Sequence, residues 1–308
     1  MGRTIAEKIL AQHTSGAARA GDLIVARVDA AMASDITAPM AIQAFHAMGG
    51  DRVWDTENCI FVIDHAAPAP NERVAALHSM MREFAADQGL PIHEAGAGIC
   101  HQLMVEQGHV SPGMLFVGAD SHTCTYGSVC SFATGVGSTD LAAVMYTGQI
   151  WLRVPQTIRV HVDGELAPGV SAKDLVLAIV GRLGLAGGTY HAIEFDGPAV
   201  EALTLSSRMT LANMAIEMGA KAGIVHPDGL DAPEELVANL RPDPDAEYAR
   251  TLRFDASSLG PQVSRPHMPD HVASVDEVLG APVDVAFIGT CVNGRLEDLH
   301  AAARVLAG

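Results

Sequence analysis

Titratable side chains directly follow several short apolar runs of this sequence. Three such places are Asp64-His65 after 61–63, Asp120-Ser121-His122 after 115–118, and Cys291 after 285–288. If the runs are buried strands of a parallel sheet, their carboxyl ends meet at one edge, where open α/β sheets bind ligands. Carboxylates paired with imidazoles there could transfer protons, and a thiolate could act as a nucleophile or a metal ligand.

Two further segments add candidates. His101 lies between small and apolar residues in 98–102, and Asn213 and Glu217 are four residues apart on a predicted helix, so they share a face. The apolar neighbours of Glu217 suggest partial burial, which would require a partner such as histidine. Taken alone, Glu217 is better explained as part of a solvated helix face, and a single histidine is more often structural. The density of these residues favours a site.

Cys291 lies between a predicted strand at 283–289 and a predicted helix at 297–306. A helix N-terminus there would lower the pKa of the thiol. The thiolate could be a nucleophile, a metal ligand or a cluster ligand, or the residue could simply fill a tight turn. Asn293 and Arg295 supply a turn and a cation that could meet a carboxylate or phosphate.

The elements that would position these residues alternate between helical and strand periodicity, which predicts an α/β fold. The predicted helices cover 4–12, 71–88, 138–152, 171–183, 206–219 and 297–306. The predicted strands cover 22–28, 58–64, 114–118, 157–162, 192–195 and 283–289, and 240–271 is expected to be irregular. Changes in composition suggest three segments: 1–155, 156–279 and 280–308.

Composition narrows the class of protein. Nineteen basic against 36 acidic residues give a net charge of −17, which disfavours nucleic acids and anionic membrane surfaces as partners. A small anionic substrate is still compatible, because a local cation or metal can override the global field. No apolar run suits a signal peptide or a membrane span, so a cytoplasmic protein is expected. The five cysteines include no Cys-x-x-Cys pair and do not suggest a disulfide framework.

Three segments resemble signature motifs of the aconitase superfamily: 118–127 (GADSHTCTYG), 208–219 (RMTLANMAIEMG) and 288–299 (IGTCVNGRLEDL). The sequence is most similar to the large subunits of the 3-isopropylmalate dehydratase branch, which also holds homoaconitase and dimethylmalate dehydratase. The resemblance runs from Thr4 to the last residue. It implies aconitase-like three-layer α/β domains, of which the third is incomplete in this chain.

The resemblance also implies a hydro-lyase that moves the hydroxyl of a small anionic hydroxy acid to the neighbouring carbon. A [4Fe–4S] cluster, held by three cysteines in the complete enzyme, would act as a Lewis acid on the substrate. A small swivel-domain subunit would be the partner and would carry the proton-abstracting serine. The implied catalytic residues are Asp64, His65, His101, Asp120, His122 and Glu217, with His101 paired to Asp120 and His122 to Glu217. The implied substrate-binding residues are Ser121, Asn213 (near the cluster), Asn293 and Arg295, and Cys291 would be the first cluster ligand.

The family's other two cluster cysteines form a Cys-x-x-Cys motif downstream of the segment that matches Cys291, and the sequence up to Gly308 contains none. Cys59, Cys100, Cys124 and Cys130 match those ligands in neither spacing nor context. The chain alone is therefore expected to hold no cluster and to be inactive. The alternatives are a binding or regulatory relative without a cluster, a hydro-lyase that uses another metal, and an inactive fragment.

Overall fold

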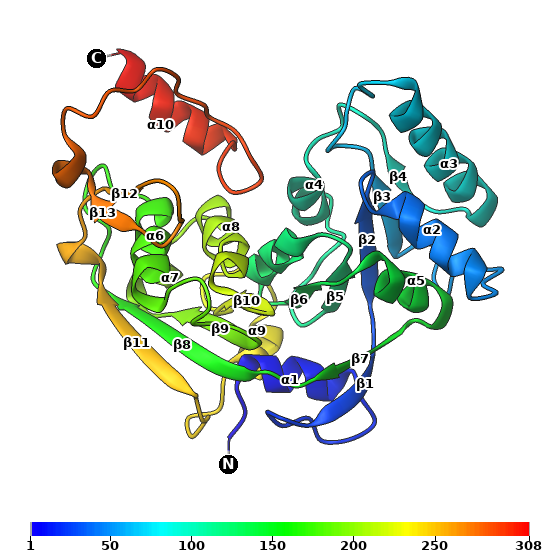
Figure 1. Cartoon of the computed structure of the whole chain (residues 1–308). Helices are drawn as coiled ribbons and strands as arrows, with labels where there is room; N and C mark the ends of the chain where they lie inside the picture. Colours follow the sequence, from blue (N-terminus) through cyan, green and yellow to red (C-terminus); the bar gives the residue numbers. More distant parts are fainter. Residues whose placement is uncertain (1, 308) are drawn as a thin grey trace.

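A five-stranded parallel sheet organises the first half of the chain in the computed structural model, which describes residues 2–307 (Figure 1). Its strands are β2 (Ala30–Ser34), β3 (Cys59–Val62), β4 (Ile92–His93), β5 (Leu115–Gly118) and β6 (Phe132–Gly135). They run in the order β4-β3-β2-β5-β6, and every pair is parallel. The chain order reverses between β2 and β5, so the carboxyl ends of β2, β3 and β5 converge on a topological switch point.

Helices cover both faces of this sheet, which explains why β2, β3 and β5 are buried along their whole length. Phe61 faces α2 (Ala38–Ala47), α3 (Glu72–Gln88) and α5 (Ser138–Thr147), in the same apolar cluster as Phe45 and Phe84. The next residue on each side, Ile60 and Val62, faces α4 (Cys100–Glu106) and the 3₁₀ helix η1 (Ser121–Val129). This alternation is the period of a β-strand buried on both sides.

A second parallel sheet repeats the strand order of the first. Its strands are β8 (Gln156–Asp163), β9 (His191–Asp196), β10 (Ala222–Val225) and β11 (Arg250–Asp255), in the order β10-β9-β8-β11. Its helices are α6 (Ala172–Leu183), α7 (Pro198–Glu201), α8 (Leu205–Asn213) and α9 (Glu234–Leu240). Ser171 caps α6 through a capping box with Asp174, as its sequence predicts. Among the described residues, no helix combines the length and apolar character needed to cross a bilayer.

The two sheets meet through η1, which packs against α8 and β10 (Figure 1). A Cβ atom on Gly127 of η1 would overlap the carbonyl oxygen of Gly223 in β10. Gly223 in turn lies against Ala212 and Ala215, so small residues allow the backbones to approach. The apolar cluster of the first sheet also includes Ala222 of β10, so this cluster extends across the predicted domain boundary at residue 155. That boundary stays a prediction.

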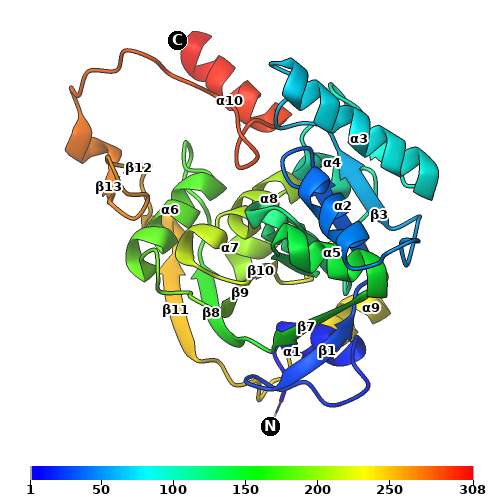
Figure 2. The same cartoon turned by 45° about the vertical axis from the view of Figure 1, so that its right-hand side comes forward.

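Two small antiparallel pairs complete the described sheets: β1 (Leu23–Arg27) with β7 (Gln149–Arg153), and β12 (Gln262–Ser264) with β13 (Val272–Ser274). Figures 1 and 2 show β1 and β7 beside α1 (Ile5–Gln12) at the bottom of both views. The short 3₁₀ helices η2 (Ile216–Met218), η3 (Ala256–Ser258) and η4 (Val275–Val278) lie in the second half of the chain.

Three predicted elements differ from the structure. The helix expected at 138–152 ends at Thr147, because Gly148 adopts the left-handed conformation and the following residues pair with β1. The helix expected at 206–219 ends at Asn213 and is followed by the separate turn η2. The segment 240–271, expected to be irregular, contains β11, which pairs in parallel with β8 and was hidden from a sequence pattern by its exposed edge position.

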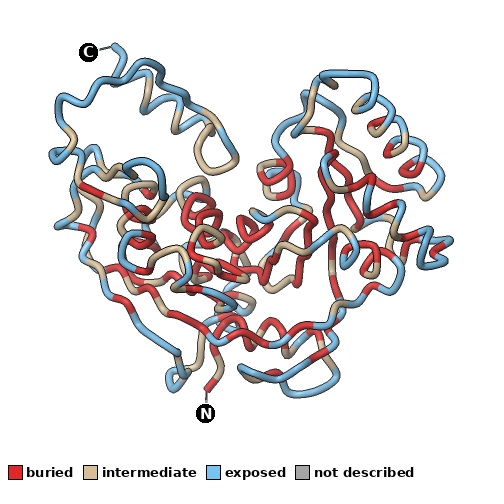
Figure 3. Tube along the Cα trace, in the orientation of Figure 1, coloured by how far each residue is buried: buried red, intermediate tan, exposed pale blue. Residues whose placement is uncertain are grey.

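The predicted strand at 283–289 is wrong. No described strand lies beside this segment to accept its backbone hydrogen bonds, and Val283, Val285 and Phe287 are 76%, 83% and 80% exposed. The helix predicted at 297–306 is confirmed as α10 (Leu296–Ala307), but none of its residues is buried. Figure 3 shows this contrast between the buried sheets and the last part of the chain, where no described residue from 279 onward is buried.

The contact between η1 and β10 can be tested with Gly127→Ala. The added methyl group must displace the backbone of Gly223, so we expect the free energy of unfolding to fall by about 1–3 kcal/mol in urea denaturation. Gly260→Ala is the matched control, because nothing lies within 4 Å of its added Cβ. Equal stability of the two variants would contradict this packing.

Candidate functional site

The carboxyl ends of β3 and β5, together with the start of α4, surround a cavity of about 190 Å³. Its lining consists of Asp64, His65, Ile99, His101, Asp120, His122 and Cys291. Five of the six predicted catalytic residues and the predicted metal ligand therefore face one space, although they come from segments far apart in the sequence. The sixth, Glu217, approaches from η2.

Asp120 is the centre of this arrangement. It follows β5 and caps η1, where its Oδ1 accepts a hydrogen bond from the His122 backbone N–H at 2.7 Å. The same Oδ1 lies 2.9 Å from His101 Nε2, and Oδ2 lies 3.3 Å from His65 Nε2. Burial raises the pKa of the carboxyl, but the hydrogen bonds with His101 and His65 outweigh it and hold the pKa far below its usual range. Asp120 is thus an anion that faces two imidazoles.

His65 lies between two carboxylates. Its Nδ1 is 2.8 Å from Asp64 Oδ1, and its Nε2 faces Asp120. The hydrogen bonds to Asp120 and then to Asp64 raise the pKa of His65 to about 10, against a smaller opposing effect of burial. The other oxygen of Asp64 accepts the Cys100 backbone N–H at 2.7 Å, which ties this pair to the start of α4. At neutral pH His65 is therefore a protonated, positively charged ring between two carboxylates.

His101 is buried at the first turn of α4. Its Nε2 faces Asp120, and its Nδ1 is 3.1 Å from the hydroxyl of Tyr126. Tyr126 is fully buried, which raises the pKa of its phenol well above the usual value. A neutral tyrosine can donate to Nδ1 while Nε2–H donates to Asp120, so the two partners select one imidazole tautomer.

His122 and Glu217 form the second predicted contact, with His122 Nε2 3.6 Å from Glu217 Oε1. The interaction with His122 lowers the pKa of Glu217, against the effect of burial. Ser121 is exposed, and its Oγ lies 3.2 Å from His122 Nδ1. Because α8 ends at Asn213, a shared helix face does not align Asn213 with Glu217, and the turn η2 places the carboxylate instead.

Cys291 is half-buried and approaches Asn213, whose Nδ2 is 3.5 Å from Sγ. The side chain of Asn213 is fully buried, and its Nδ2 also donates to Thr125 Oγ1 at 2.8 Å. Burial raises the pKa of the Cys291 thiol, which contradicts the lowering expected from a helix N-terminus. The reason is geometric: α10 begins only at Leu296, beyond Cys291.

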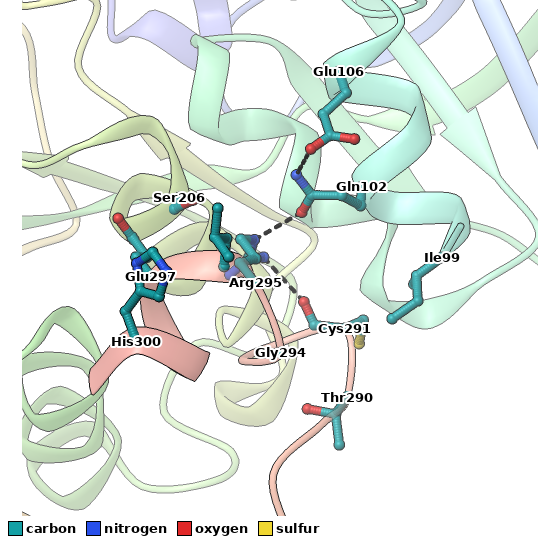
Figure 4. Close-up of a pocket in the computed structure, with 11 residues that line it drawn as sticks. Ile99, Gln102, Glu106, Ser206, Thr290, Cys291, Gly294, Arg295, Glu297 and His300 are labelled. Atoms are coloured by element: carbon teal, nitrogen blue, oxygen red, sulfur yellow. Dashed lines mark hydrogen bonds between the residues drawn. The ribbon is translucent and has the colours of Figure 1, made fainter. Parts of the chain in front are cut away.

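Arg295 fastens the Cys291 segment to α4. Arg295 also lines a second cavity, which has a volume of about 530 Å³. Figure 4 shows its guanidinium between Gln102 and the carbonyl of Cys291. Nε donates to Gln102 Oε1 at 2.9 Å, and Nη2 donates to the Cys291 carbonyl at 3.0 Å. Nη1 donates to the carbonyl of Val292 and to Thr210 Oγ1. Four of the five N–H groups thus have partners among the described residues, so the fifth is a candidate donor to a ligand.

Asn293 lies outside the linings of both cavities. Its Nδ2 donates to Asp298 Oδ1 at 2.9 Å, and its Oδ1 is buried without a partner among the described residues. The other oxygen of Asp298 accepts the backbone N–H groups of Gly294 and Arg295. Asn293 and Asp298 therefore shape the turn that leads into α10.

Two site groups escaped the sequence analysis. Lys173, half-buried in the first turn of α6, lies in the field of Glu217, Asp298 and Cys291, and burial lowers its pKa. Nothing in its local sequence pointed to the site, because only tertiary packing brings α6 toward η2. Asp35 lies beneath the Asp64-His65 turn. It follows the apolar run 30–33 and one serine, a pattern close to the one that drew attention to Asp64 and Asp120, and that signal could have found it.

The described residues do not fit a cluster held by three cysteines. Cys291 is the one described cysteine that is not fully buried. Burial raises the pKa of both Cys59 and Cys124 to about 12, and it raises the pKa of Cys130 well above the usual value. Ligand atoms of Asp64, His65 and Cys100 lie within 4.8 Å of one another, a spacing that a metal ion could bridge, but Cys100 is also buried.

The raised pKa of His65 predicts a pH-dependent contribution to stability. A histidine whose folded pKa exceeds its unfolded value of 6.5 contributes stability fully below that value and loses it as pH rises through about 10. We expect His65→Asn to destabilise the chain more at neutral pH than above pH 10, as measured by urea denaturation. His46→Asn, which changes an exposed ring, is the control. A constant effect of His65→Asn across this range would be inconsistent with the raised pKa.

Comparison with known proteins agrees with the motif resemblance. Residues 7–281 match the model of the aconitase family (aconitate hydratase). The 3-isopropylmalate dehydratase large subunit 1 of Methanopyrus kandleri is 49% identical over 315 residues, covering 100% of this chain and 75% of the relative. The 3-isopropylmalate dehydratase large subunit of Syntrophus aciditrophicus is 47% identical, covering 100% of this chain and 76% of the relative.

A third relative carries a different name. The probable methanogen homoaconitase large subunit of Methanosarcina mazei is 49% identical over 292 residues, covering 92% of this chain and 75% of the relative. About a quarter of each of these three relatives thus lies outside the match. A family match over most of the chain and close relatives over nearly its whole length lead to one conclusion. The chain belongs to the aconitase family of hydro-lyases.

Proposed function

We propose that this chain is the large subunit of a hydro-lyase that isomerises a hydroxy-dicarboxylate of the 2-isopropylmalate type by removing and re-adding water. The observation that carries the proposal is the set of histidine–carboxylate contacts centred on Asp120. Dehydration requires a proton for the departing hydroxyl and a base for the neighbouring C–H group. The protonated His65 and the ionised Asp120, which line the same cavity, supply part of that chemistry.

His65 is the proton donor in this proposal. It is protonated at neutral pH, lines the cavity, and its side chain is 37% exposed, whereas that of His101 is 3% exposed. Its proton would go to the hydroxyl oxygen as the C–O bond breaks and the hydroxyl departs as water. Asp64 and Asp120 would orient the ring and stabilise its charge before the transfer. His101 and Tyr126 would hold Asp120 in place from the other side.

An anionic substrate needs local cations in a chain whose net charge is −17. Lys173 and the guanidinium of Arg295, through its remaining N–H group, are the cations that we assign to the substrate carboxylates. Ser121, exposed beside His122, would contact the substrate as well. The base that removes the C–H proton would come from a small-subunit partner, in keeping with the designation of the relatives as large subunits.

Membership of the family implies a [4Fe–4S] cluster in the complete enzyme. We propose Cys291 as one ligand, with Asn213 donating a hydrogen bond to its sulfur. The other thiolates would have to come from outside the residues described, because Cys59, Cys100, Cys124 and Cys130 are all buried.

Residues 280–308 would begin a third α/β domain after two domains at 1–155 and 156–279. The segment 283–288 and α10 expose large apolar residues, among them Val285, Phe287 and Leu296. Such a surface in water is unfavourable, and a neighbouring sheet would bury it.

A homoaconitase is the second candidate. The Methanosarcina mazei relative with that name is as similar to this chain as the Methanopyrus kandleri relative, at 49% identity each. The two candidates share the proton chemistry and differ in the substituent that the cavity must accept, which is branched and apolar in 2-isopropylmalate and carries a third carboxylate in homocitrate. The assembled enzyme should therefore be assayed with 2-isopropylmalate and with homocitrate in parallel.

The cluster proposal predicts that the 308-residue chain alone binds no stable cluster. After anaerobic reconstitution with iron and sulfide, we expect no persistent charge-transfer absorbance and no dehydratase activity. In a chain completed with the family's remaining cysteines, Cys291→Ser should abolish iron binding, and Cys130→Ser should retain it. A full cluster spectrum from the 308 residues, or equal iron retention by both variants, would refute the assignment.

The acid assignment predicts the effect of His65→Asn in the enzyme assembled with its small subunit. Loss of a general acid should lower kcat about 10²–10⁴-fold, while KM changes much less. His46→Asn should leave both parameters unchanged, since its ring is exposed and away from the site. Wild-type kcat in His65→Asn would exclude His65 as the proton donor, and an inactive wild-type assembly on both acids would overturn the proposed function.

A further inference from the structure

A buried carboxylate underlies the Asp64-His65 turn. Asp35 follows β2 at the switch point, and the oxygens of its side chain accept three consecutive backbone N–H groups. Oδ1 accepts those of Asp64 and His65 at 3.3 and 2.9 Å, and Oδ2 accepts that of Ala66 at 2.9 Å. A fourth contact joins Oδ2 to His78 Nε2 on α3 at 3.0 Å. One side chain therefore joins the ends of β2 and β3 to α3.

This carboxylate is ionised in the fold. The Asp35 side chain has no exposed surface, and burial alone would raise its pKa. The hydrogen bonds from His65, Ala66 and His78 outweigh that effect and lower the pKa. A buried anion without such partners would be strongly unfavourable, so the turn and the carboxylate depend on each other.

Asp35 does not reach the cavity, and it therefore acts through its neighbours. The Asp64-His65 dipeptide has to satisfy three contacts: Asp64 with the Cys100 N–H, Asp64 with His65 Nδ1, and His65 Nε2 with Asp120. The 3.3 Å contact to Asp120 is the longest of them, so it is the one most sensitive to a shift of the turn. The hydrogen bonds to Asp35 fix the backbone from which both side chains project.

We propose that Asp35 and His78 form a positioning pair that holds His65 in line with Asp120. This inference rests on the proposed function, in which His65 donates the proton. His78 fixes the carboxylate from the side of α3, where its own ring is 5% exposed. The pair transmits the position of α3 to the proton donor, although neither residue touches the substrate.

Variants of Asp35 and His78 can remove the hydrogen bonds while keeping the size of the side chain. Asp35→Asn keeps the shape but replaces one acceptor oxygen with an N–H donor that faces other donors. His78→Gln keeps an amide N–H that can reach Asp35, whereas His78→Leu removes the donor at similar size. Asp51→Asn is the control for loss of a negative charge, because Asp51 is exposed. All variants are first checked for wild-type far-UV circular dichroism.

The first measurement uses the 308-residue chain labelled with ¹⁵N-histidine, in which the His65 ring signals are assigned by their absence from His65→Asn. In the wild type we expect both ring N–H protons of His65 to be observable, because Asp64 and Asp120 accept them. Asp35→Asn and His78→Leu should lose or shift the Nε2–H signal, and His78→Gln and Asp51→Asn should keep it. If Asp35→Asn fails to fold, the two His78 variants still decide.

The second measurement uses the enzyme assembled with its small subunit. A misplaced proton donor should lower kcat about 10²-fold in Asp35→Asn with KM little changed. His78→Gln should recover most of the kcat that His78→Leu loses. Wild-type His65 signals in both Asp35→Asn and His78→Leu would overturn the positioning pair. An inactive wild-type assembly would overturn the proposed function, whereas the ring signals would still test the pair.

Discussion

The ionised carboxylate of Asp120 is the interaction on which the site depends. Removal of a charge from water is costly, and this one is compensated by His101, His65 and the His122 N–H. Each partner comes from a different element, so the carboxylate also fixes the distance between them. The Asp120 carboxylate also keeps His65 protonated, because its hydrogen bond raises the pKa of that ring. The histidines in turn lower the pKa of Asp120 and keep it ionised.

The strand order of the first sheet makes this convergence possible. Reversal of the order between β2 and β5 leaves their carboxyl ends adjacent, and β3 lies beside β2. Asp35, Asp64 and Asp120 each follow one of these strands. Three acidic residues at one edge would repel one another, but each is paired: Asp35 with His78, Asp64 with His65, and Asp120 with His101. Histidines thus let an acidic chain concentrate carboxylates at its site.

The second sheet contributes the remaining wall. The tight approach of η1 to β10 brings α8 and η2 beside the first sheet, and with them Asn213 and Glu217. The segment that carries Cys291 is attached by Arg295 to Gln102, not by a helix or a sheet of its own. Its position therefore rests on polar contacts and on Val292, which packs against the apolar cluster of the second sheet, while Val283, Val285 and Phe287 stay exposed.

The sequence by itself determined the α/β class, most element positions and the family, because apolar periodicity and short motifs are local properties. It also singled out Asp64, His65, Asp120 and His122, since polar residues after buried strands form a local signal, and His101 by its small and apolar neighbours. Only the tertiary structure decided that these side chains share one cavity, that α8 stops before Glu217, that Lys173 lies in the field of Glu217, and that Asp35 supports the Asp64-His65 turn. It also corrected the pKa of Cys291 and the strand at 283–289. Burial and strand pairing depend on what lies across the fold, and no window of neighbouring residues contains that information.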